Sequence, residues 1–400
     1  MVLIVCAAQF LAQLGAFTVP ALLPTFIAEW ELSATRAGWL TGIFYAGYTL
    51  SVPVLVSLTD RIDPKRIYLV GVSLIAVGMF AYATVDGFWA ALACRALVGV
   101  GWAGVYMPGL KALSDLVEGP RQSRAVAAHA FAVGISGALS FALAGIVASL
   151  LDWRWAMAVG GFGAVAAFAL MALLLPRSPR NFSQGRQRRL LDFRPALRNR
   201  SALAYSLAYC FHTWEMAALR MWVVAFLSYA LLATGSSPGL VGPTMAATLV
   251  GLVGVCASVL GNEASIRLGR SRAITLIMML SMLLAAAVGF SAGVSYPLAV
   301  GLVLLFAVLI YADSSSLTAG TVGSAEPASR GATMALHSTL GYAGGFLGPV
   351  VVGLIIDATG GETVTGYGLA FGHLVLVGLA GILAIRVLRP QGLEGDRSGR

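Results

Sequence analysis

A series of long apolar runs constrains this chain more than any other feature of its sequence. Twelve runs can be marked off, and each is long enough for a helix to cross about 30 Å of hydrocarbon at about 1.5 Å per residue. Of the 400 residues, 58% are hydrophobic and 11% are charged, whereas a soluble domain carries about 25% charged residues. Because lipid satisfies no backbone hydrogen bonds, such runs must form helices. The sequence therefore predicts an all-α polytopic membrane protein.

The twelve predicted transmembrane helices divide into two halves of six. Their approximate bounds are 2–28, 37–58, 67–85, 88–110, 124–150, 154–175, 201–232, 241–261, 273–291, 297–320, 331–356 and 367–386. We expect the opening MVLIVCAAQF to begin the first span and not to be a removable leader. The expected parts are an N-terminal six-helix bundle at 1–175, a basic linker at 176–200, a C-terminal six-helix bundle at 201–388 and a tail at 389–400.

The distribution of basic residues predicts the orientation in the membrane. With the N-terminus in the cytoplasm, the cytoplasmic segments hold 22 of the 26 lysines and arginines, and the opposite side holds two, Arg36 and Arg154. The positive-inside rule then places both termini in the cytoplasm, in a plasma or inner membrane. The linker carries eight arginines and one aspartate, so we expect residues 177–200 to contact anionic lipid and not nucleic acid.

The two halves resemble each other at a fixed offset. The loop residues Arg61 and Arg66 recur 206 residues later as Arg267 and Arg272, and Ser123–Arg124 recurs as Ser329–Arg330 at the same offset. Together these matches indicate a duplicated six-helix unit, which is an architecture of secondary transporters.

Two motifs resemble those of the major facilitator superfamily. The loop VSLTDRIDPKR (56–66) is similar to the family's G-x-L-A-D-R-x-G-R-K element, with both glycines replaced. The segment RALVGVG (95–101) is similar to the family's R-x-x-Q-G-x-G element, with valine in place of glutamine. The helix-five G-P-x-x-G-G element of the family's antiporters is absent from AVGISGALSFALAG, and GGFLGP at 344–349 is a partial echo of it.

The resemblance implies two helical bundles that rock around a central cavity lined by helices one, four, seven and ten. It also implies that the loop after helix two helps to close a gate. The expected gating residues, with their counterparts in the second half, are Asp60, Arg61, Lys65, Arg66, Arg267 and Arg272.

Ionisable residues inside the predicted helices are the second strong signal. Arg95 lies in helix four, His212, Glu215 and Arg220 lie in helix seven, and Asp313 lies in helix ten. A charge at the bilayer centre costs about 2.5–3.5 kcal/mol on insertion scales, so such residues are expected to face a polar interior and to neutralise one another. His212 and Glu215 are three residues apart and share a helix face, whereas the five-residue spacing of Glu215 and Arg220 disfavours pairing within the helix.

These residues define the expected site of a carrier. The proton-coupling candidates are Glu215, His212 and Asp313, and the substrate-binding candidates are Arg95, Arg220, Gln9, Gln13 and Trp214. Static ion pairing of Glu215 and backbone capping by Asp313 are the alternatives. We expect His129 and His337 to lie at the membrane interface, and the glycine-rich segments 134–145 and 341–353 to serve close helix packing.

The favoured function is secondary transport of a small solute, coupled to protons, with an anion as the cargo because guanidinium groups suit carboxylates. The alternatives are an exporter of apolar or cationic compounds, a divalent-metal carrier, and a sensor or assembly protein that transports nothing. No hydrolase, zincin or nucleotide-binding motif is present in the sequence, so we expect no enzyme activity, cofactor or bound metal. We expect a monomer.

Overall fold

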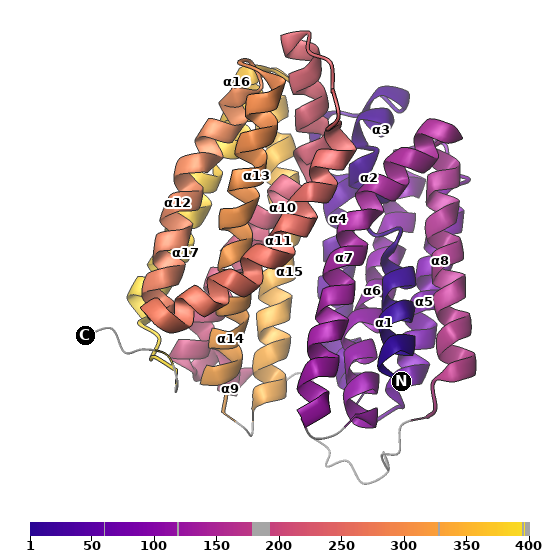
Figure 1. The fold of residues 1–400 in the computed structure, drawn as a ribbon, viewed down its shortest axis with the longest axis vertical. Coiled ribbons are helices and arrows are strands. Elements are labelled where there is room, and N and C mark those ends of the chain that lie inside the picture. The colour runs from indigo at the N-terminus through magenta and orange to yellow at the C-terminus, as the bar shows by residue number, and fades with distance from the viewer. Residues whose placement is uncertain (60, 118–119, 178–192, 327–328, 394–395, 397–400) are drawn as a thin grey trace. The chain divides into compact units, whose positions relative to one another are not determined.

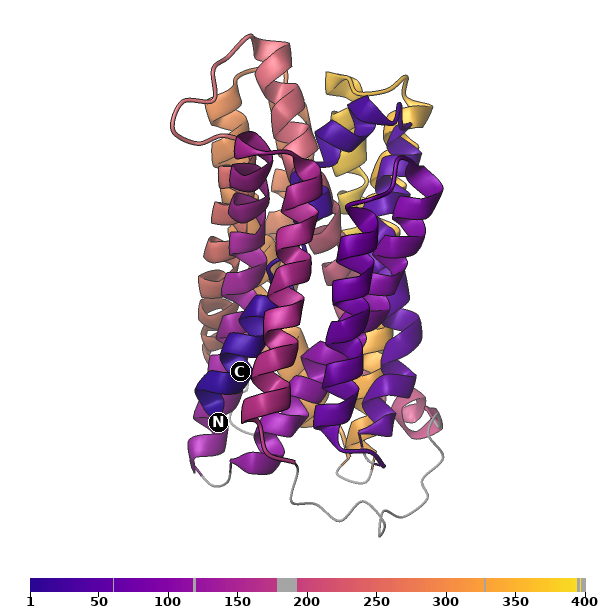
Figure 2. The same ribbon diagram turned by 90° about the vertical axis from the view of Figure 1, so that its right-hand side faces the viewer.

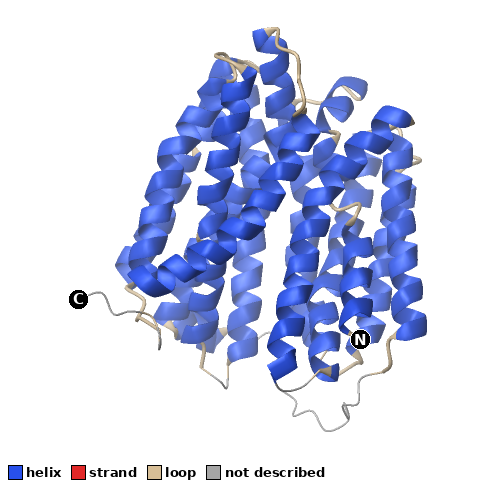
Figure 3. Ribbon diagram, in the orientation of Figure 1, coloured by secondary structure: helices blue, strands red, loops and turns tan. Residues whose placement is uncertain are grey.

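The computed structural model describes residues 1–400 except 60, 118–119, 178–192, 327–328, 394–395 and 397–400. None of the described residues lies in a β-strand, and nearly all the described chain is helical (Figure 3). Eleven of the described helices are long and apolar enough to cross a membrane, and a shorter apolar helix precedes them. The all-α membrane fold predicted from the apolar runs is confirmed.

The helices labelled in Figure 1 follow one another with few long connections. In chain order they are α1 Val2–Gln13, α2 Thr18–Ala21, α3 Leu23–Glu29, α4 Ala34–Leu58, α5 Pro64–Tyr82, α6 Phe88–Leu116, α7 Pro120–Leu150, α8 Trp153–Leu174, α9 Arg194–Arg198, α10 Arg200–Thr234, α11 Pro243–Leu268, α12 Arg270–Ser291, α13 Tyr296–Ala312, α14 Ser314–Ser324, α15 Arg330–Ala358, α16 Val364–Gly372 and α17 Leu374–Leu388.

The chain forms two compact units that share α4. The first unit comprises Met1–Leu22 and Ile43–Leu190, and the second comprises Leu23–Gly42 and Leu191–Arg400. In the first unit α5 packs against α6 and α8, and α1 packs against α7 and α8. In the second unit α10 lies at the centre and contacts α13, α14, α15 and α17. The bounds predicted for the bundles, linker and tail stay a prediction.

The prediction that the first span is one continuous helix is wrong. Helix α1 ends at Gln13, and the chain continues as the short α2 and α3, so that α1 stops partway along the first unit (Figure 2). Residues 14–17 form turns instead of continuing the helix. Two further predicted spans contain one turn residue each, Asp313 between α13 and α14 and His373 between α16 and α17, where the backbone keeps right-handed helical dihedral angles, and each pair of helices forms one continuous candidate span.

Glycines bring the backbones of neighbouring helices into direct contact. A Cβ atom on Gly344 of α15 would lie 2.0 Å from the carbonyl oxygen of Cys210 in α10. A Cβ atom on Gly348 would lie 2.4 Å from the carbonyl oxygen of Trp214, also in α10. In the first unit, a Cβ atom on Gly99 of α6 would lie 2.1 Å from the carbonyl oxygen of Phe44 in α4. Small residues are what allow membrane helices to approach this closely. The packing role predicted for segment 341–353 is confirmed.

Aspartates hold several helix ends. Asp63, which replaces a glycine of the family motif, caps α5 by accepting a hydrogen bond from the Lys65 amide at 3.0 Å. Asp152 caps its own helix by accepting from the Trp155 amide at 3.0 Å. Asp357, near the end of α15, instead accepts from the amides at the start of α4, Ala34 at 2.9 Å and Thr35 at 2.8 Å. Helix starts favour such acceptors.

We predict that Gly344→Ala destabilises the protein whereas Gly301→Ala does not. The added methyl group at position 344 has to displace the α10 backbone, and overpacking of this kind costs about 1–3 kcal/mol. Nothing lies within 4 Å of a Cβ atom at Gly301, and alanine favours a helix over glycine by about 1 kcal/mol. The measurement is the thermal unfolding temperature of each purified variant in detergent. Equal unfolding temperatures for the two variants would contradict the packing assignment.

Candidate functional site

A buried ion pair joins two helices of the second unit where one of them is interrupted. His212 of α10 places Nδ1 at 2.7 Å from Oδ1 of Asp313, the residue between α13 and α14. The two side chains are 1% and 4% exposed. A carboxyl group at this depth is costly unless a polar group lies beside it, and the imidazole occupies that position.

Glu215 brings a second carboxyl group to the same place. It lies one turn after His212 on α10 and is 4% exposed. The Ser281 hydroxyl of α12 is within hydrogen-bonding reach of the Glu215 carboxyl, and Asp313 is close enough to act on it electrostatically. Among the described residues, Oε1 of Glu215 has no hydrogen-bond partner. The structure thus brings together all three proton-coupling candidates.

His337 of α15 extends this group of ionisable residues. Its ring stacks on Tyr209 with the centroids 4.1 Å apart, and the other neighbour of Tyr209 is His212, at 5.4 Å. The ring nitrogens of His337 lie 3.0 Å from the Thr321 hydroxyl and 3.4 Å from that of Thr318. His337 is 2% exposed and His129 is 1% exposed, so both are buried inside their helical units, and their expected place at the membrane interface stays a prediction.

Two further candidates on α10 contact other helices. Arg220 donates from Nε to the Tyr311 hydroxyl of α13 at 2.8 Å and also from Nη2, and its guanidinium lies 5.3 Å from the centroid of the Tyr311 ring. Trp214 donates from Nε1 to Nε2 of His373 at 3.0 Å, at the interruption between α16 and α17. Tyr311 and His373 were not predicted from the sequence, because an isolated tyrosine or histidine in an apolar run carries no spacing signal.

Arg95 of α6 is the corresponding buried charge of the first unit. It is 1% exposed, and Nη2 donates to the carbonyl oxygen of Ala16 at 2.7 Å, within the turn that ends α1. The guanidinium lies 4.5 Å from the centroid of the Phe44 ring. Its Nε and Nη1 atoms have no hydrogen-bond partner in the described part of the chain, so two buried donors remain for another acceptor.

The glutamines of α1 lie near this turn. Gln9 and Gln13 are both buried, and they contact each other with 3.4 Å between Nε2 of Gln9 and Oε1 of Gln13. The Ser136 hydroxyl of α7 donates to the same oxygen of Gln13 at 3.2 Å. On the same helix, Ser140 accepts a hydrogen bond from the Phe17 amide at 3.0 Å.

The predicted gating residues lie at helix ends. Lys65 donates to the carbonyl oxygens of Ala172 at 2.9 Å and Leu175 at 2.5 Å, at the end of α8, which is the favoured place for a cation. Arg267 pairs with Glu263 one turn away at 2.8 Å, with both side chains exposed. Arg61, Arg66 and Arg272 are exposed. Asp60 lies outside the described residues.

The donor sets do not favour a metal ion. Within the described ranges there is no group of three or more histidine, cysteine, aspartate or glutamate side chains arranged to hold one. What the geometry offers is two acids and an imidazole in the second unit, which can exchange protons, and an arginine with unused donors in the first, which can bind an anion.

Ionisable groups buried among many membrane-spanning helices are typical of membrane transporters. The family model described as Major Facilitator Superfamily matches residues 5–349. The chain therefore belongs to this family, and the expectation from the two sequence motifs is confirmed. The family and the fold are those of transporters and not of enzymes.

Named relatives agree with this assignment. The chain is 27% identical over 287 residues to the human protein named Protein spinster homolog 1, covering 67% of this chain and 54% of the relative. It is 24% identical to the Xenopus tropicalis protein named Sphingosine-1-phosphate transporter SPNS2, covering 56% of this chain and 45% of that one. The chain spans about half the length of these relatives.

Among solved structures, a bacterial homologue of the human lysosomal transporter Spinster, in an inward-facing and occupied conformation, has the same fold. The TM-score is 0.74 at 17% sequence identity, covering 97% of this chain and 94% of the other.

We predict that Arg95→Met lowers the thermal unfolding temperature, because the Ala16 carbonyl then loses its donor in a turn that lipid cannot solvate. A hydrogen bond from a charged group contributes about 1.5–3 kcal/mol. Arg95→Lys should restore part of the loss, since it keeps the charge but not the guanidinium geometry. The matched control is Arg124→Met at an exposed position of α7. An unchanged unfolding temperature for Arg95→Met would refute the role of Arg95 in holding this turn.

Proposed function

We propose that this protein is a secondary transporter that couples the movement of a small organic anion to protons, by alternating access of its two helical bundles. The proposal rests above all on one observation, the contact of His212 with Asp313 at a helix interruption with Glu215 beside it. We further infer that it works as a monomer in a plasma or inner membrane with both termini cytoplasmic, as the distribution of arginines indicates.

The composition of this cluster favours proton exchange. It contains two carboxyl groups and one imidazole, so with all three groups ionised it carries one net negative charge, and one added proton makes it neutral. Protonation of the Asp313 carboxylate removes its charge from the contact with His212 between α13 and α14. Proton binding at this point therefore acts on the junction of α13 and α14, which is the kind of discontinuity that moving transporter helices use.

An anionic cargo is supported by Arg95. Two of its guanidinium nitrogens, Nε and Nη1, have no hydrogen-bond partner among the described residues, and a guanidinium donates charge-assisted hydrogen bonds to carboxylate and phosphate oxygens. One relative carries the name of a sphingosine-1-phosphate transporter, and the phosphate of that compound is an acceptor of this kind. Arg220, whose donors meet the Tyr311 hydroxyl, is the weaker candidate for direct contact with the cargo.

The test of the proposal measures proton movement in proteoliposomes that contain a pH-sensitive dye. Sphingosine-1-phosphate is the anionic probe, and tetraphenylphosphonium is the probe for an exporter of apolar cations. We predict that the anion but not the cation changes the internal pH, and that Glu215→Gln abolishes this change because a carboxamide cannot bind and release the proton. Glu263→Gln, which removes an exposed carboxylate, is the matched control and should behave like the unaltered protein.

The other functions give different results in the same experiment. An exporter of cations responds to tetraphenylphosphonium, and a sensor or assembly protein that transports nothing responds to neither probe. Proton movement that persists undiminished in the Glu215→Gln variant rules out the assigned role of Glu215.

A further inference from the structure

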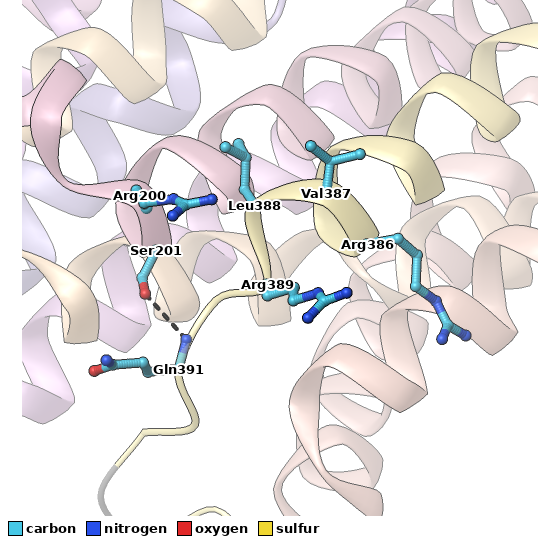
Figure 4. A pocket seen from close by; sticks show the side chains of 7 residues that line it. All are labelled: Arg200, Ser201, Arg386, Val387, Leu388, Arg389 and Gln391. Atoms are coloured by element: carbon cyan, nitrogen blue, oxygen red, sulfur yellow. Dashed lines mark hydrogen bonds between the residues drawn. The ribbon is translucent and has the colours of Figure 1, made fainter.

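A basic cavity lies in the second unit where α10 begins and α17 ends. Its volume is about 630 Å³, and its lining includes three arginines, Arg200, Arg386 and Arg389, with Val387 and Leu388 between them. Figure 4 shows Arg200 from α10 and Arg389 from the end of α17 extending in the same direction. The cavity is separate from the cluster around Glu215, and neither the family motifs nor the proposed transport cycle uses it.

The chain that follows α17 is held in the conformation that forms this cavity. Arg389 ends the helix with φ 48° and ψ 67°, in the left-handed region that side chains other than glycine seldom adopt. Next, the Gln391 amide donates to the Ser201 hydroxyl at 3.0 Å, which is drawn as the dashed line in Figure 4. Strain of this kind persists only where neighbouring contacts impose it, and it is often found at functional sites.

A buried ion pair fixes the same segment further along. Arg270, at the start of α12, donates from Nε and Nη2 to the two carboxylate oxygens of Asp396 at 3.0 and 2.9 Å. The two side chains are 4% and 6% exposed. Because both oxygens of the Asp396 carboxylate accept hydrogen bonds from Arg270, this carboxylate is paired with Arg270 and not with the arginines of the cavity.

Among the described residues, the arginines of the cavity have no acidic partner. No acidic residue is part of its lining, and within the described parts of the chain no ion pair involves Arg200, Arg386 or Arg389. By contrast, Arg267 and Arg270 of the same unit both have acidic partners. The positive-inside rule accounts for arginines at a helix end, but it does not require three of them, from two helices, to surround one cavity.

An apolar surface on α17 leads into the cavity. Leu376, Leu379, Leu383 and Val387 recur at intervals of three or four residues, and their exposed fractions are 70%, 49%, 61% and 59%. They therefore form one stripe along the lipid-facing side of the helix. Val387, the last residue of the stripe, is also part of the cavity lining. A ligand with an anionic head and an apolar chain matches both surfaces.

We propose that this cavity, the Arg200–Arg386–Arg389 pocket, binds the phosphate headgroup of an anionic membrane phospholipid, with an acyl chain lying along the α17 stripe. Basic pockets at the ends of transmembrane helices recognise such headgroups, and guanidinium groups bind phosphate oxygens in pairs. The bound lipid joins the start of α10 to the end of α17. It thereby supports the helix that carries His212 and Glu215, and it neutralises the charge of the pocket.

The test is native mass spectrometry of the full chain in detergent, with phosphatidylglycerol and phosphatidylcholine added in equal amounts. The unaltered protein should retain phosphatidylglycerol in preference. The triple variant Arg200→Gln, Arg386→Gln, Arg389→Gln should bind it on the order of tenfold to a hundredfold more weakly, since each basic residue contributes to the attraction. The matched control, Arg121→Gln, Arg124→Gln, Arg330→Gln, removes the same charge from exposed positions outside the pocket and should keep the preference.

Inorganic phosphate distinguishes a lipid site from a site for free phosphate. At millimolar concentration it should raise the thermal unfolding temperature less than phosphatidylglycerol does, and an equal effect would refute the lipid assignment. Retention of the preference by the triple variant would refute the pocket itself. If the triple variant does not fold, the single variant Arg386→Glu makes the same test, and it should lose phosphatidylglycerol binding while it keeps phosphatidylcholine binding unchanged.

Discussion

The cost of an unsatisfied polar group inside the membrane is the constraint on which the rest of this structure depends. Lipid offers no hydrogen bonds, so an interrupted helix is tolerated only where protein side chains complete its backbone. At the end of α1, Arg95 donates to the Ala16 carbonyl and Ser140 accepts from the Phe17 amide. The Ala16 carbonyl and the Phe17 amide thus have hydrogen-bond partners although the helix has ended.

Polar side chains inside the second unit meet one another in a similar way. The side chain of Asp313, between α13 and α14, is contacted by His212, and that of His373, between α16 and α17, is contacted by Trp214. Both partners lie on α10, two residues apart, so one helix reaches two discontinuities. The close approach of α10 to α15 through Gly344 and Gly348 keeps α10 in place. Packing by small residues and the polar contacts at the interruptions are therefore parts of one arrangement.

Apolar periodicity was enough to predict the fold but not its interruptions. The runs that contain α1, α13 and α16 read as continuous, because hydrophobicity reports where a helix can lie in lipid and not where its hydrogen bonding breaks. An asparagine or proline would have marked a break; the turn at residues 14–17 contains neither, and no proline adjoins Asp313 or His373. The turn at residues 14–17 is bonded by Arg95 and Ser140, which are distant in sequence.

Part of the candidate site could be predicted from the sequence, namely the part that lies within one helix. The spacing of His212 and Glu215 places them on one face of α10, and their charge marks them as unusual in an apolar run. Spacing within one helix cannot show that Asp313, about a hundred residues later, meets His212, or that Tyr209 lies between His212 and His337. Such contacts between distant segments are set by helix packing, to which a single sequence gives no direct access.

The repeat conserves the scaffold of the two halves but not their chemistry. Gln9 and Glu215 are 206 residues apart, the offset of the repeated loops, so one position carries an amide in the first half and an acid in the second. Gln9 contacts the neutral Gln13, which in turn accepts from Ser136, whereas Glu215 lies near Asp313, which contacts His212. An amide cannot exchange a proton at physiological pH, and a buried guanidinium cannot readily lose one. Of this pair, only the position in the second half therefore carries a group that can exchange a proton, and the buried Arg95 belongs to the first half. Under the proposed function, the two halves of one duplicated scaffold divide the binding of the anion and of the proton between them.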